Sequence, residues 1–198
     1  MSKIRLTPNA SGTGTVTLTV PSTSTDRTIT LPDTTGTLLD SSGQMVDLWR
    51  ITANFNVTTG PSNLDSGITV TGWERNDNAG FGYVGAGLTE SSGIFSFPST
   101  GIYFITVVGL WGSVANNYQS AYISTTQNNS TYNHQTINWC WNNTGDYTKQ
   151  IGQHLFDVTD ISQCKFKIQA VRDYANNNLL GQTTVTRTHI TVQRVGDT

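Results

Sequence analysis

The residues able to do chemistry in this sequence form no recognisable catalytic pattern. The three histidines, His134, His154 and His189, are far apart and have no cysteine or carboxylate partner at a metal-ligand spacing. The sequence contains neither a Gly-x-Ser-x-Gly nucleophile turn nor a Gly-rich phosphate-binding loop. We therefore predict a protein that is not an enzyme and has no cofactor.

One polar segment, Asn76-Asp77-Asn78-Ala79-Gly80, is superficially similar to a calcium-binding loop. It lacks the ligand spacing and the distal glutamate that such a loop requires. Asp157 and Asp160 flank an expected turn, where we predict that they cap the backbone and take no part in acid–base chemistry. No metal site is predicted.

The strongest binding signal is the segment Trp139-Cys140-Trp141-Asn142-Asn143. In a strand, residues two apart lie on one face, so both tryptophans would be presented together. Aromatic rings beside Asn amides suit a saccharide, because the apolar side of the sugar stacks and its hydroxyls find fixed partners. We predict a ligand-binding site formed by Trp139, Trp141, Asn142 and Tyr147. The alternative is that both tryptophans are anchors in the core or in an interface between chains.

Composition excludes several classes of function. Only 12% of the 198 residues are charged, the net charge is −2, and no basic stripe marks a nucleic-acid site. Two cysteines, Cys140 and Cys164, do not make a disulfide framework. We expect two free thiols, with a single disulfide as the alternative. Because neither a signal segment nor a long apolar span is present, we expect synthesis in the cytoplasm and no membrane insertion.

The most apolar part of the chain is 94–111, whose pattern is that of two strands joined by a Pro/Gly turn. The second strand is apolar on both faces, whereas an antiparallel strand normally keeps one face for water. Its second face must be covered by another layer or another chain. Large aromatic residues concentrate at interfaces, so the predicted chain-to-chain face is Tyr103, Ile105, Val107 and Trp111. The alternative is that both faces lie inside one subunit.

Further strand patterns follow at the regular spacing of an all-β sandwich. Alternation of apolar and polar residues in the last of them is typical of half-exposed strands. Around the central pair, the predicted strands are 48–55, 68–73, 120–126, 135–141, 151–158, 164–171 and 186–195. We predict an antiparallel β-sandwich.

The segment Gly93–Phe104 resembles the signature of the globular heads of the C1q and tumour-necrosis-factor families: an aromatic strand, a Pro/Gly turn, then Gly-Ile-Tyr-Phe. Later segments, 155–160, 164–171 and 188–195, resemble the late strands of those heads. The resemblance implies a C1q/TNF-like jelly roll over residues 46–198 that assembles as a homotrimer. The Gly-X-Y stalk and the acidic calcium cluster of some members are missing. Complement or cytokine function does not carry over.

Residues 1–45 form a separate extended arm in this prediction. Two alternating segments, 15–20 and 27–31, each end at a proline, which cannot donate to a ladder. A two-stranded ribbon of this kind is only marginally stable by itself in water, so we expect it to pair with copies of itself or to dock on another protein. The alternative is a disordered Thr/Ser-rich tail.

Residues 12–39 also resemble a segment near the N-termini of many bacteriophage tail-fibre and virion proteins. That resemblance implies virion attachment through the apolar residues Val16, Leu18, Val20, Ile29 and Leu31.

These patterns together predict a bacteriophage virion structural protein. It would be a homotrimeric fibre or knob, held by its arm to tail or capsid proteins, exposed on the particle and contacting the host surface, with a host glycan as the expected ligand. The alternative is a capsid decoration or cement protein that stabilises the shell without binding a receptor. A glycan-cleaving enzyme is a third hypothesis, but the sequence shows no recognisable site with the pair of carboxylates that such an enzyme requires.

Overall fold

A computed structural model describes residues 24, 44–58, 67–112, 117–173 and 177–198. The chain divides into two units, Met1–Leu38 and Leu39–Thr198, and the described residues belong almost entirely to the second. The predicted attachment residues Val16, Leu18, Val20, Ile29 and Leu31 lie outside the described residues. The arm and its boundary at residue 45 therefore stay predictions.

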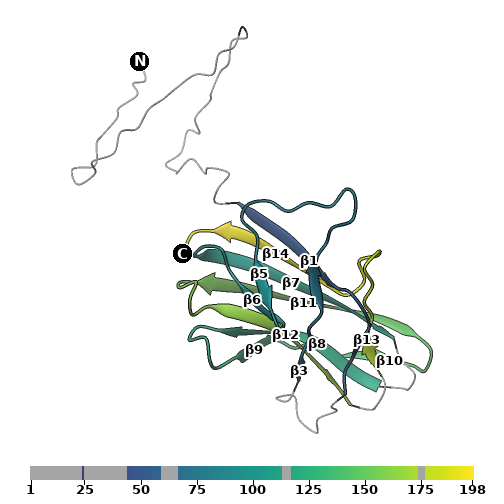
Figure 1. The fold of residues 1–198 in the computed structure, drawn as a ribbon. Helices are drawn as coiled ribbons and strands as arrows, with labels where there is room; N and C mark the ends of the chain where they lie inside the picture. Colours follow the sequence, from purple (N-terminus) through teal and green to yellow (C-terminus); the bar gives the residue numbers. More distant parts are fainter. Residues whose placement is uncertain (1–23, 25–43, 59–66, 113–116, 174–176) are drawn as a thin grey trace, which may run out of the picture. The chain divides into compact units, whose positions relative to one another are not determined.

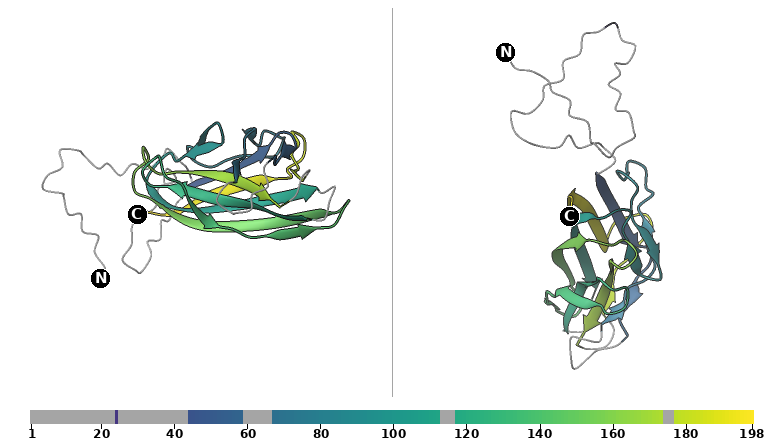
Figure 2. Two further views of the ribbon diagram at one scale, coloured as in Figure 1. Left: turned by 90° about the horizontal axis from the view of Figure 1, so that it is seen from below. Right: turned by 90° about the vertical axis from the view of Figure 1, so that its left-hand side faces the viewer.

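The described residues form strands and no helix, arranged as two antiparallel sheets that pack face to face (Figures 1 and 2). Sheet A contains β1 (Met45–Ile51), β2 (Phe55–Asn56), β4 (Trp73–Arg75), β7 (Gly101–Gly112), β11 (Tyr147–Val158), β13 (Asn178–Leu179) and β14 (His189–Gly196). Sheet B contains β3 (Ile68–Thr69), β5 (Thr89–Ser91), β6 (Ile94–Ser96), β8 (Asn117–Thr126), β9 (Asn133–Thr136), β10 (Cys140–Asn142) and β12 (Lys165–Arg172). The predicted antiparallel sandwich is confirmed.

Aromatic side chains fill the space between the sheets. Phe95 of β6 and Phe166 of β12 are paired across sheet B and stack with ring centroids 4.8 Å apart. Trp49 and Trp73 reach Phe95 from sheet A with edge-on contacts at 5.6 and 5.7 Å. Alternation along β6 and β12 thus points large apolar side chains into the core and leaves polar ones outside.

The central strand β7 corrects one prediction. Its residues Tyr103, Ile105, Val107 and Trp111 are at most 1% exposed and belong to the core between the two sheets. Another chain cannot reach them, so their assignment to a chain-to-chain interface is wrong. The period of a strand separates two faces but does not say which one the second sheet will cover.

The other face of β7 is only partly covered. Ile102, Phe104 and Leu110 on this face are half-buried. The adjoining strand β11 places Ile151 opposite Val108 and Leu155 opposite Phe104, and these two β11 side chains are 51% and 59% exposed. We call the surface made by Ile102, Phe104, Leu110, Ile151 and Leu155 the outer face of sheet A.

One predicted strand, 135–141, is broken in the structure. β9 ends at Thr136 and β10 begins at Cys140. Between them, Asn138 donates its side-chain amide to the carbonyl of Ile151 at 2.8 Å. The neighbouring Thr136 hydroxyl donates to the carbonyl of Gln153 at 2.7 Å. These side chains turn the segment toward the edge of β11, which alternation alone does not reveal.

Gln150 on β11 links the two sheets through one buried amide group. Its Oε1 accepts the backbone N–H of Ala121 at 2.7 Å and the indole N–H of Trp111 at 3.4 Å. Its Nε2 donates to Ser120 Oγ and to the carbonyl of Ala121, both at 3.1 Å, and also to the carbonyl of Asn138. A single side chain therefore holds β8 and the segment before Trp139 to sheet A.

We expect Gln150→Leu to lower the free energy of unfolding by about 2–4 kcal/mol, because the backbone N–H of Ala121 and other buried groups would lose their partners. Gln163→Leu is the matched control, since Gln163 is exposed in the turn between β11 and β12 and should change stability by less than about 0.5 kcal/mol. Urea unfolding monitored by tryptophan fluorescence measures both. Equal stability of the two variants would contradict the linking role of Gln150.

Candidate functional site

The pairing of the strands defines two ends of the sandwich. At one end lie Met45, where β1 begins, and Gly101, which pairs with Val158. β1 and β7 both pair antiparallel with β14, so they run in the same direction. At the far end of β7, Gly112 pairs with Tyr147, after about 35 Å of strand. Figure 1 shows β10 and β13 at this far end.

Four aromatic side chains are exposed in this far region. They are Tyr118, Trp139, Trp141 and Tyr147, with exposed fractions of 52%, 43%, 45% and 72%. Trp141 of β10 pairs with Tyr118 of β8, and the Thr148 hydroxyl of β11 donates to the Trp141 carbonyl at 3.0 Å. We call these four residues the aromatic tip.

The ring of Trp141 is held in place although half of it is exposed. The Tyr118 ring contacts it edge-on with centroids 4.5 Å apart. The indole N–H donates to Asn143 Oδ1 at 3.2 Å, and the Asn143 amide in turn donates to Asp146 Oδ2 at 3.3 Å. Because the indole N–H is already bonded, the exposed part of Trp141 offers mainly an apolar surface. Such a fixed ring is suited to stacking.

The sequence-predicted ligand residues come together only in part. Trp141 and Tyr147 lie at this end, on β10 and β11, and Asn142 ends β10 opposite Asn117. Trp139 precedes β10 instead of sharing a strand with Trp141. The sequence reading missed Tyr118, because polar Asn117 and Gln119 concealed the true start of β8. The exposure of Trp139 and Trp141 disfavours the alternative that they are core anchors.

Neither cysteine provides reactive chemistry in this region. Cys140, between the two tryptophans, is half-buried, and burial raises the pKa of its thiol to about 11. A thiol with this pKa stays protonated at neutral pH and is a poor nucleophile. Cys164 is fully buried before β12. Both are free thiols, as expected.

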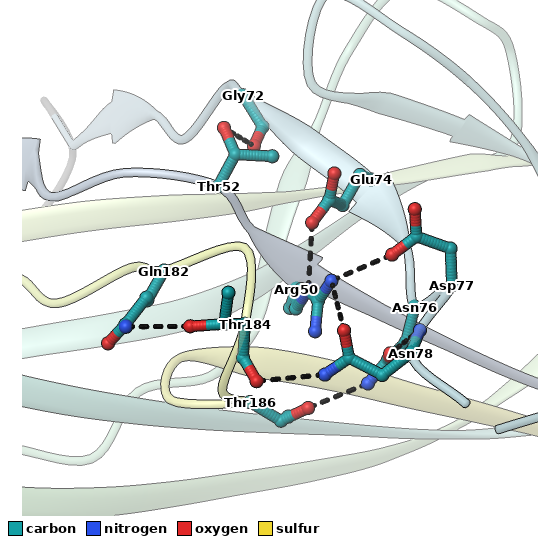
Figure 3. A network of polar contacts seen from close by, with 10 residues as sticks. All are labelled: Arg50, Thr52, Gly72, Glu74, Asn76, Asp77, Asn78, Gln182, Thr184 and Thr186. Atoms are coloured by element: carbon teal, nitrogen blue, oxygen red, sulfur yellow. Dashed lines mark hydrogen bonds and ion pairs between the residues drawn. The ribbon is translucent and has the colours of Figure 1, made fainter. Parts of the chain in front are cut away.

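The segment similar to a calcium loop binds a guanidinium group in place of a metal ion (Figure 3). Arg50 is fully buried, and its Nε donates to Glu74 Oε1 at 2.8 Å. Its Nη2 donates to Asp77 Oδ1 at 2.9 Å and to Asn78 Oδ1 at 3.4 Å. The side-chain oxygens that a cation would need therefore face an arginine. Within the described ranges, no cluster of three or more His, Cys, Asp or Glu residues could hold a metal.

The remaining ionisable residues singled out in the sequence have structural surroundings. Burial lowers the pKa of both His154 and His189, which favours neutral rings. Asp160 accepts both the backbone N–H and the hydroxyl of Ser162 at 2.7 Å, and these bonds lower the pKa of its carboxyl. The predicted capping role of Asp160 is confirmed. No helix in the described part of the chain meets the length and hydropathy needed to cross a membrane.

Comparison with known proteins identifies the fold. No protein-family model matches the chain, and no curated protein sequence matches it. Among solved structures, murine APRIL at pH 8.5 aligns with a TM-score of 0.51 and 14% identity, over 77% of this chain and 99% of that one. The Eiger TNF of S. frugiperda aligns with a TM-score of 0.54 and 11% identity, over 78% of this chain and 94% of that one. The residues described here thus adopt a TNF-like jelly roll, as the sequence resemblance implied.

Proposed function

We propose that this chain is a structural protein of a bacteriophage particle whose head forms a trimer and contacts the host surface. The resemblance of residues 12–39 to phage fibre and virion proteins supports the particle assignment. The observation that carries the host-contact role is the aromatic tip, which lies at the end of the head opposite Met45. If the arm preceding Met45 holds the particle, the tip is the part of the head farthest along the strands from that attachment.

The outer face of sheet A supports the trimer. Paired strands β7 and β11 present aliphatic and aromatic side chains in register on this face, with Leu155 opposite Phe104. Lys149 and Gln153 of β11 lie on this same face, opposite Leu110 and Thr106, so polar side chains interrupt the apolar ones. The exposed apolar side chains of this face would gain free energy when a second copy covers them, by about 1.5–3 kcal/mol for each large side chain fully buried. We therefore move the proposed chain-to-chain contact from the inner to the outer face.

The aromatic tip supports binding of a host glycan. Trp141 offers an immobilised apolar ring, and Asn143 and Asp146 lie beside it. Sugars bind weakly at single sites of this kind. Three linked copies in one trimer would raise the apparent affinity without any further contact.

We expect the native protein to have a mass near three times 21.5 kDa and Leu155→Asp to shift it toward that of the single chain. The substitution places a charge on an apolar surface that would be buried, at a cost of several kcal/mol. Ile161→Asp is the matched control, because Ile161 is 46% exposed in the turn between β11 and β12. Light scattering after size exclusion measures all three. A wild-type monomer, or an undisturbed Leu155→Asp trimer, would remove this face from the proposal.

For the host contact, we expect particles that carry Trp141→Ala to adsorb to host cells at least about tenfold more slowly, since avidity multiplies the loss at each of three sites. Phe81→Ala is the matched control, because Phe81 is an aromatic residue of similar exposure, 48%, in the loop that pairs with Val46. Adsorption is counted as unbound particles over time. If both variants adsorb like the wild type, the aromatic tip is not the contact.

The alternative function, that of a capsid decoration protein, predicts a different result. A decoration protein is expected to bind preformed shells that lack it and to raise their melting temperature, with adsorption unchanged by Trp141→Ala. Purified chain added to such shells separates the two functions.

A further inference from the structure

A separate hollow of about 470 Å³ lies on the outer face of sheet B. Its lining residues are Ser130, Tyr132, Asn133, His134, Lys167 and Gln169. Phe166 and Ile168 point into the core, so the alternating Lys167 and Gln169 point outward. Ser124 of β8 pairs with both His134 and Lys167 and is about 20 Å of strand from Tyr118. The hollow is thus distinct from the aromatic tip.

A directed chain of hydrogen bonds fixes the wall of this hollow. Ser124 Oγ donates its one proton to Gln169 Oε1 at 2.8 Å. It must therefore accept in its 3.0 Å contact with His134 Nδ1, which places a proton on that nitrogen. The Gln169 amide in turn donates to the carbonyl of Gly67 at 2.6 Å. His134 and Gln169 are consequently held in one orientation before any ligand arrives.

Two groups in the hollow lack an acceptor. The ammonium group of Lys167 lies 4.3 Å from the centre of the Tyr132 ring and forms no ion pair with any residue that the structure describes. The Tyr132 hydroxyl is buried and has no hydrogen-bond partner among the same residues. Burial lowers the pKa of Lys167 and raises the pKa of Tyr132. Both groups are partly desolvated, and no lining residue carries a carboxylate that would satisfy them.

We propose that this hollow binds the anionic group of an acidic saccharide, a carboxylate or a phosphate, through Lys167 and the Tyr132 hydroxyl. A charge-assisted hydrogen bond to a desolvated ammonium is among the stronger single contacts that a protein can offer. Ser130 and Asn133 lie at the same hollow and provide hydroxyl and amide partners for the sugar ring. The neighbouring Lys165 is not part of the site, since its ammonium donates to Ser96 Oγ at 3.0 Å.

The test is a titration of the full chain at low ionic strength with glucuronate, with glycerol phosphate, and with glucose as the neutral probe, followed by NMR of the Tyr132 and His134 rings. We expect saturable shifts with at least one anion and none with glucose. Saturation by glucuronate alone identifies a carboxylate ligand, and saturation by glycerol phosphate alone identifies a phosphate ligand. Added salt should weaken the binding, because the contact is partly electrostatic.

Paired lysine variants isolate the site. Lys167→Gln and Lys165→Gln change the net charge equally, on the same face of β12. We expect Lys167→Gln to weaken anion binding at least about tenfold, and Lys165→Gln to change it by less than about twofold. Tyr132→Phe, which keeps the ring under Lys167, should weaken binding by about threefold or more. Equal effects of the two lysine variants, equal binding of glucose, or no binding of either anion would overturn the proposal.

The hollow and the aromatic tip are expected to act independently. Trp141→Ala is expected to leave anion binding unchanged, whereas Lys167→Gln is expected to leave the trimer intact. A failed adsorption experiment therefore does not count against the hollow, and a failed titration does not count against the tip.

Discussion

The aromatic contact between the two sheets is the interaction on which the rest of the structure depends. Phe95 and Phe166 stack within sheet B, and Trp49 and Trp73 close on Phe95 from sheet A. Removing these rings from water supplies the main driving force for packing the two layers. Since only about a third of the chain is apolar, a few large side chains must do this. Their position on β6 and β12 decides which residues of those strands face outward, including Lys167.

Buried charged residues on both sides of β1 are paired with opposite charges, and these contacts hold the long connection between β4 and β5 in place. Toward the core, Asp47 accepts two hydrogen bonds from Arg75 and one from the backbone N–H of Leu88. On the opposite side, Arg50 is held by Glu74 and Asp77. Removing one partner of such a pair would leave an unpaired buried charge, which costs several kcal/mol. The polar segment after β4 is therefore structural, and its likeness to a calcium loop has no functional meaning here.

The two faces and the far end of β7 have different surroundings. One side of the strand completes the core, while the other adjoins exposed Ile151 and Leu155. The far end of the strand lies beside the aromatic tip. The proposed trimer would use Ile151 and Leu155 and leave Trp141 open, so that assembly and host contact would not compete for this ring. Gln150, buried below Trp111, ties that far end to both sheets.

The sequence by itself determined the antiparallel sandwich and most strand positions, because alternation with a period of two is a local property of each segment. It also identified Trp141 and Tyr147 as residues of interest. Only the tertiary structure decided which face of β7 is covered, since both faces are apolar and the choice depends on where sheet B packs. The broken strand at Asn138, the pairing of Tyr118 with Trp141 and the hollow between β9 and β12 likewise join residues far apart in the chain. Contacts of this kind arise from strand order and register, which no local pattern specifies.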